Sequence, residues 1–131
     1  MSFSDYFENA LVSHLFWHTS LSAAPATLYL AVGTATDETT LTEPVGNNYS
    51  RVAITSSVAN WSSSTNGVVT NVSDIDFPAP SGSWGTLTHC GLYDASTSGN
   101  LLLITALTGS RAITTGDTLR FSAGNIVISI N

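Results

Sequence analysis

Two histidines near the N-terminus have a spacing that could bind a metal ion. His14 and His18 are four residues apart, so on a helix both imidazoles would lie on one face, as in zinc-binding helices. Leu15 occupies the position where a zinc protease carries its general-base glutamate. A third ligand would have to be His89 or a distant carboxylate. The pattern therefore favours two amphipathic side chains at the edge of a buried helix face over a metal site.

Cys90 follows His89, and a cysteine beside a histidine could be a nucleophile with its base. Both residues lie in a stretch that alternates like a strand, where neighbouring side chains point to opposite faces. We therefore expect Cys90 to be an inert thiol of the core. It is the only cysteine, so an internal disulfide is excluded.

Asp74 and Asp76 would share one face of a strand, where paired carboxylates can perform acid–base work or hold calcium. The calcium-loop pattern is missing around them, so a solvated strand edge that discourages unwanted pairing is the better interpretation. The sequence also has no nucleophile elbow and no glycine-rich phosphate loop. We expect no enzymatic activity and no cofactor.

One helix and many strands would position these side chains. Apolar and aromatic residues recur every three to four positions at the N-terminus, which predicts a helix from about Ser4 to Trp17, capped by Ser2 or Ser4. Its apolar stripe comprises Phe3, Phe7, Ala10, Leu11, His14, Leu15 and His18. A lone amphipathic helix in a strand-rich chain must pack on its own sheet or on a neighbouring subunit.

From Pro25 onward the hydrophobic period changes to two, which predicts strands. Asn66-Gly67 is a strong turn signal and predicts a hairpin between the strands Val58–Ser62 and Val68–Val72. The expected strands are Thr27–Gly33, Tyr49–Ser56, Val58–Ser62, Val68–Val72, Ile75–Phe77, Trp84–Asp94, Leu101–Leu107, Thr118–Ser122 and a last one with Ile126, Ile128 and Ile130 on one face.

Two of these strands carry detailed expectations. Leu101–Leu107 is almost continuously apolar, so it should be central and buried on both faces. Trp84–Asp94 alternates, which predicts two opposite faces. One face would hold Trp84, Thr86, Thr88, Cys90 and Leu92, and the other Leu87, His89 and Tyr93.

The predicted fold class is all-β: an antiparallel β-sandwich, similar to a jelly roll, with one N-terminal α-helix. We expect a single domain over residues 1–131, with a helical segment at 1–24 and the sandwich at 25–131.

The composition indicates a surface made for contact. Only 9% of residues are charged, against roughly 25% in an average domain, and the three cations are all arginines. With a net charge of −6, the chain has no basic stripe for nucleic acid and no attraction to an anionic membrane. Removing water from a hydroxyl-rich, weakly charged surface costs little free energy when that surface packs against neighbouring proteins. No signal peptide or membrane-spanning run is visible, so we expect the protein to be made in the cytoplasm.

Several spaced blocks resemble a family of small structural proteins of tailed phages, whose members are labelled capsid decoration (cement) proteins or tail fibre proteins. The blocks are Trp84–His89, Gly91–Ala95, Gly99–Leu102, Ala106-Leu107, Gly116–Phe121 and Ala123-Gly124, preceded by a short helix at Asp5–Trp17, Pro25–Ala31 and Tyr49–Arg51. The resemblance covers almost the whole chain. It implies a β-sandwich of the virion, assembled in the host cytoplasm, and implies no catalytic residues.

Within this resemblance, the first functional hypothesis is a capsid decoration protein, expected as a homotrimer, that binds between major capsid protein subunits and stabilises the head. The N-terminal aromatic residues would make docking or trimer contacts: Phe3, Tyr6, Phe7 and Trp17. The alternative is a tail fibre or receptor-binding component that uses exposed aromatics such as Tyr49, Trp61 or Trp84 on host glycans. A hydrolase of the host envelope is a third, more distant option.

Overall fold

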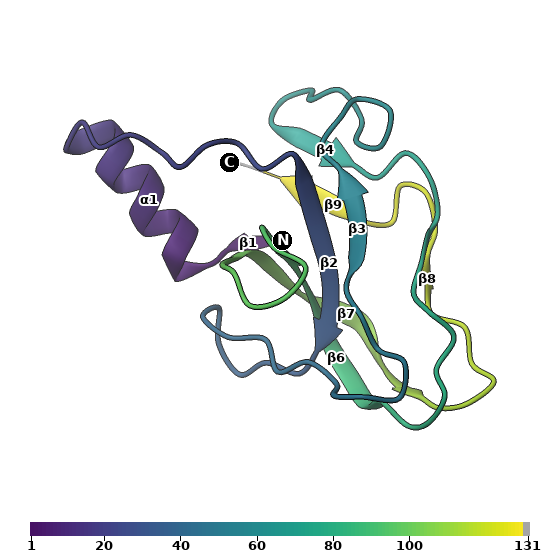
Figure 1. The fold of residues 1–131 in the computed structure, drawn as a ribbon. Helices are drawn as coiled ribbons and strands as arrows, with labels where there is room; N and C mark the ends of the chain where they lie inside the picture. Colours follow the sequence, from purple (N-terminus) through teal and green to yellow (C-terminus); the bar gives the residue numbers. More distant parts are fainter. Residues whose placement is uncertain (130–131) are drawn as a thin grey trace.

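The computed structural model describes residues 1–129, which form one helix and nine strands (Figure 1). Because Ile130 lies outside the described residues, its expected place in the last strand is not tested. In chain order the elements are β1 (Ser2–Phe3), α1 (Asp5–Phe16), β2 (Thr27–Gly33), β3 (Val52–Thr55), β4 (Val68–Thr70), β5 (Ile75–Asp76), β6 (Gly85–Tyr93), β7 (Leu101–Ile113), β8 (Arg120–Phe121) and β9 (Val127–Ser129).

The strands form two layers, and every strand pair is antiparallel. One layer is a five-stranded sheet in the order β1-β7-β6-β2-β3. Opposite it stand two separate ribbons, β4 with β9 and β5 with β8. The predicted all-β fold with a single N-terminal helix is confirmed.

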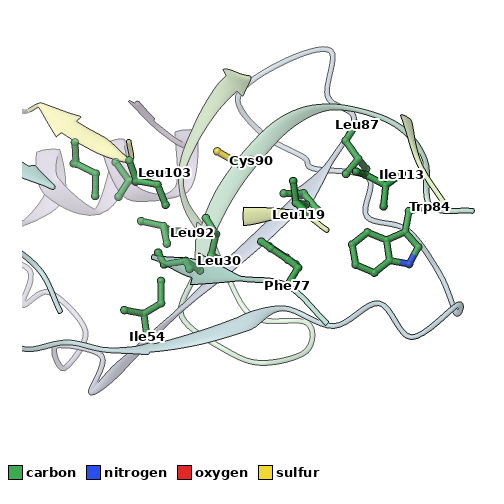
Figure 2. Close-up of a cluster of buried hydrophobic side chains, with 14 of the residues drawn as sticks. Leu30, Ile54, Phe77, Trp84, Leu87, Cys90, Leu92, Leu103, Ile113 and Leu119 are labelled. Atoms are coloured by element: carbon green, nitrogen blue, oxygen red, sulfur yellow. The ribbon is translucent and has the colours of Figure 1, made fainter. Parts of the chain in front are cut away.

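The main hydrophobic core lies between these layers (Figure 2). Leu30 and Leu92 of the sheet are completely buried, and they belong to the same cluster as Phe77 and Leu119 from the ribbon side. A smaller cluster involves Ala31, Tyr93 and the loop residue Leu41. Since Ala31 is flanked by core residues Leu30 and Val32 on β2, this cluster covers the other face of the sheet.

The alternation of apolar and polar residues predicted the positions of most strands. β2 has the predicted bounds, with Leu30 and Val32 in the main core as expected. Asn66 and Gly67 both have positive φ angles, 54° and 75°, as a tight hairpin turn requires. The strand predicted at Val58–Ser62 is wrong, however. Isolated bridges join Trp61 to Asn71 and Thr65 to Val68 across the turn, and the ladder partner of β4 is β9 instead.

The predicted assignment of side chains to the two faces of β6 is wrong in the first half of the strand. Leu87 is 1% exposed and lies in the main core with Cys90, although three positions separate them. The pairing with β7 shifts between Leu87 and His89, so one residue, Thr88, stands opposite four residues of β7. This bulge reverses the alternation of the strand and turns Leu87 inward.

Strand β7 is longer and less buried than its apolar sequence predicts. It runs for 13 residues and is flanked on its outer side only by the two-residue β1. Leu103 and Ile104 are buried where β1 covers them, whereas Leu107 is half-buried and Ala106 is exposed. The expectation of a central strand buried on both faces therefore holds only for its beginning.

Helix α1 has the predicted extent, with Ser4 as N-cap and Trp17 as C-cap. The sequence left two packing partners open, a sheet of the same chain or a neighbouring subunit, and the helix contacts its own sheet only in part, at β1 and β7. No residue of α1 is buried, and the helix projects from the sandwich beyond β1 (Figure 1). A neighbouring subunit as the partner of the apolar stripe stays a prediction.

Candidate protein-docking surface

The root of α1 is held firmly on the sandwich. Backbone N–H of Ser4 donates to the carbonyl of Leu102 at 2.8 Å, and its hydroxyl donates to the carbonyl of Leu101. The same hydroxyl accepts from the N–H of Phe7 at 3.3 Å, which caps the helix. Phe3 of β1 packs edge-to-face on Phe7, with 5.0 Å between ring centroids. These contacts anchor the first turn of the helix.

The far end of α1, the helix tip, consists of Leu15, Phe16 and the C-cap Trp17. These side chains are 71%, 77% and 72% exposed. The helix ends there because the N–H groups of Trp17 and Thr19 both bond to the carbonyl of Ser13, and His18 has a φ of 56°. Three large apolar side chains in a row therefore stand in solvent at the end of the helix opposite to its root.

A groove runs beside the root of α1. Its volume is about 380 Å³, and the chain that returns from the helix at residues 21–25 forms one wall. Apolar side chains make up most of the lining, including Tyr6, Phe7, Ala10, Leu21, Leu28 and Leu102. We call this the helix-base groove. One surface of the molecule thus carries both a projecting apolar tip and an apolar groove.

The four residues expected at an interface divide between these parts. Phe3 and Phe7 are half-buried in the root, so they position the helix. Tyr6 is 43% exposed in the groove, and Trp17 lies at the tip. Leu15 and Phe16 were not among the four, although they are the other exposed apolar side chains of the tip. Their signal was present in the sequence, since apolar side chains occupy nearly the whole circumference of the last turns, which is typical of a helix surrounded by protein.

The candidate metal ligands do not form a cluster. His14 is exposed, with Nδ1 3.2 Å from the carbonyl of Thr19. His89 lies on β6, where its Nδ1 is 2.8 Å from the hydroxyl of Thr88. Within residues 1–129, no three side chains of the His, Cys, Asp or Glu type come together at metal-binding distance.

Cys90 is 3% exposed, as the interpretation as a core thiol predicts. Burial raises the pKa of its thiol to about 11, which disfavours the thiolate that a nucleophile needs. The acidic pair is a strand-edge feature: Arg120 binds Asp76 at 2.6 Å and approaches Asp74 at 3.5 Å, and all three side chains are about half-exposed. This arrangement links β5 to β8.

The aromatic residues considered for glycan binding belong to the core. Trp61 and Trp84 are 7% and 5% exposed, so the expectation that they lie exposed in loops is wrong. Tyr49 is half-buried and packs edge-to-face on Trp84 at 5.3 Å, and its hydroxyl donates to Glu43 at 2.7 Å. Their position follows from the sandwich, because all three side chains belong to or pack against its main core.

Few cations remain on the surface. Arg51 is enclosed, with its guanidinium bonded to Glu43 and 3.5 Å above the centroid of the Tyr93 ring. Arg120 is paired with two carboxylates. The surface therefore offers few positive charges for ionic contacts. The helix of the described chain is too short to cross a membrane.

The model of the family described as "Podophage GP4 fiber I protein gp80" matches residues 2–129. No curated protein matches the chain.

Proposed function

On the premise that this chain belongs to the podophage fibre protein family of gp80, a family of phage structural proteins, we propose that it attaches to neighbouring virion proteins through α1. The proposed role is adhesive and non-enzymatic and needs no cofactor. The site of attachment is the helix tip together with the helix-base groove.

One observation carries this proposal: α1 buries none of its residues, although Leu15, Phe16 and Trp17 are among the largest apolar side chains of the chain. Burying an aromatic or leucine side chain contributes about 1.5–3 kcal/mol, so three of them in solvent represent a large unused driving force. Exposed apolar patches of this kind mark protein–protein contacts. A subunit whose neighbours cover the helix would recover this free energy.

We propose a fibre as the location, because the family is described by a fibre protein. A fibre made of compact subunits needs an adhesive element at each junction, and a projecting helix provides one. The aromatic residues first considered for glycans are buried, so this proposal assigns the chain to fibre assembly and leaves receptor contact to other surfaces.

Decoration of the capsid is the second candidate. It is favoured by the compact two-layered shape of residues 1–129, which include no extended shaft, and by the low charge of the surface. In this role a homotrimer would bind the major capsid protein at several points at once, so that weak contacts add up. Stabilisation of the head follows if the protein binds only the assembled shell.

The experiment is incorporation into particles, followed by counting. Phages that encode Phe16→Ser/Trp17→Ser are expected to lose the protein from purified virions, while a Val45→Ser/Val58→Ser variant keeps it, because Val45 and Val58 are 93% and 81% exposed away from α1. Normal incorporation of the tip variant would refute attachment through α1. Quantitative mass spectrometry of wild-type virions separates the locations, since a few copies indicate a fibre and hundreds indicate decoration of the shell.

A further inference from the structure

The helix tip and the helix-base groove are complementary in character and lie on the same molecule. We infer that the occupant of the groove is the helix tip of a second copy of this chain, so that each copy gives one tip and receives one. This inference rests on the proposed attachment through α1 and names the partner of that surface.

The first argument is area. Phe16 and Trp17 are more than 70% exposed, and aromatic side chains bury about 150–250 Å² each, so with Leu15 a docked tip would remove about 400 Å² from solvent. The lining of the groove exposes less than half of that area. A single contact therefore reaches only about 550 Å², within the range of crystal contacts, whereas two reciprocal contacts reach about 1,100 Å², above the roughly 1,000 Å² that a biological interface needs.

A second copy meets this requirement without any further surface. In a closed assembly each protomer uses both its tip and its groove, and no apolar end is left over. A different protein would have to bring both a matching groove and a matching tip. Reciprocity is thus the reason to choose a copy of the same chain as the occupant.

The second argument is charge. The tip carries His14 and His18 and no carboxylate, whereas the surroundings of the groove are acidic. Asp94 contributes to the groove lining, and Asp5 and Glu8 lie in the first turn of the helix beside it. Docking of a tip therefore places no carboxylate next to another carboxylate. It brings the imidazoles of His14 and His18 toward the acidic side chains around the groove.

The shape of the groove agrees with an apolar, aromatic guest. Small residues form its outer wall, where Ser22, Ala23 and Ala24 return from the helix to β2. Leu28 and Leu102, which are half-buried, also line the groove. Small side chains leave room for a large ring, which is the arrangement expected of a pocket that accepts an aromatic anchor.

The test is sedimentation velocity of the full chain over a dilution series. The wild-type protein is expected to form a closed dimer that dissociates on dilution. Emission of Trp17 should shift to the blue as the oligomer forms, because Trp61 and Trp84 are already buried and contribute a constant background. Phe16→Ser/Trp17→Ser should weaken association by about 30-fold or more.

A second variant acts from the other side of the contact. Ala23→Trp fills the groove from its exposed wall without altering α1, and it should weaken association as much as the tip variant. The Val45→Ser/Val58→Ser variant should associate like the wild type. A wild-type chain that stays monomeric at every concentration, or tip and groove variants that associate normally, would overturn the inference.

These outcomes are distinguishable from failure of the proposed function. A chain that stays monomeric, but whose tip variant is lost from virions, keeps the attachment through α1 and assigns the groove to a different virion protein. A chain that oligomerises through the tip, but whose tip variant is incorporated normally, keeps self-association and refutes attachment through α1.

Discussion

Glu43 and Arg51 form an enclosed ion pair: Oε1 of Glu43 lies 2.6 Å from Nη2 of Arg51, and their side chains are 18% and 8% exposed. Arg51 also donates to the carbonyls of Ala95 and Ser98 at 2.8 Å each. The pair therefore ties the loop after β2 to the loop after β6. Every strong polar group in it has a partner, which is the condition under which an enclosed charge is tolerated.

Replacing Glu43 by glutamine should lower the free energy of unfolding by about 3 kcal/mol, because an almost isosteric amide leaves the guanidinium enclosed without its counter-charge. Urea denaturation followed by circular dichroism measures the change. Glu38→Gln, at an exposed carboxylate of the same loop, should change it by less than about 0.5 kcal/mol. Equal effects of the two substitutions would show that the ion pair has no structural role.

Ser4→Ala should destabilise the root of α1. The substitution removes the hydrogen bond that the hydroxyl donates to Leu101 and the cap that it offers to the N–H of Phe7. A lost cap and an unpaired buried carbonyl together cost about 1–2 kcal/mol. Denaturation measures this loss, and the exposed Ser2 provides the control as Ser2→Ala. An unchanged midpoint for Ser4→Ala would contradict the assigned role.

Gly33→Ala should cost about 3 kcal/mol through overpacking. A Cβ at this position would lie 2.1 Å from the carbonyl oxygen of Thr42, which belongs to the backbone bridge between Thr34 and Thr42 and cannot move aside cheaply. At Gly109 a Cβ meets nothing within 4 Å, so Gly109→Ala should be neutral. Thermal unfolding of both variants tests the close approach, and similar melting temperatures would disprove it.

Stability should fall at alkaline pH. Burial raises the pKa of the Cys90 thiol from 9.0 to about 11, so the folded chain keeps a proton that the unfolded chain has lost between these values. The unfolded state binds fewer protons in this pH range. The contribution of the protonated thiol to stability is therefore complete below pH 9.0 and is lost as the pH rises toward about 11. The pKa of Tyr49 is raised too, by burial first and then by its hydrogen bond to Glu43, which extends the decline above pH 10.0.

Urea midpoints measured across this range provide the check. In Cys90→Ala the decline between pH 9.0 and about 11 should be shallower than in the wild type, with the Tyr49 contribution retained. A parallel decline in both proteins would rule out Cys90 as its source. In the native wild type the thiol should react with a thiol reagent only as fast as the protein unfolds.

Local signals in the sequence determined the elements whose structure depends on near neighbours. The helix bounds follow from Ser4 as a cap and from the three-to-four-residue spacing of apolar residues. Strand β2 follows from alternation, and the turn at Asn66-Gly67 follows from the ability of these residues to adopt positive φ. The composition and spaced blocks also sufficed to identify the kind of protein, since the family match spans residues 2–129.

Only the tertiary structure decided which segments meet. The pairing of β4 with β9 joins residues almost 60 positions apart, and no local pattern encodes it. The bulge opposite Thr88 arises from the register of two strands, so Leu87 enters the core against its own alternation. For the docking surface, the sequence located an apolar helix, but an apolar stripe is the same whether a sheet or another chain covers it. The exposure of the helix tip is a property of the folded sandwich, whose layers are complete without α1.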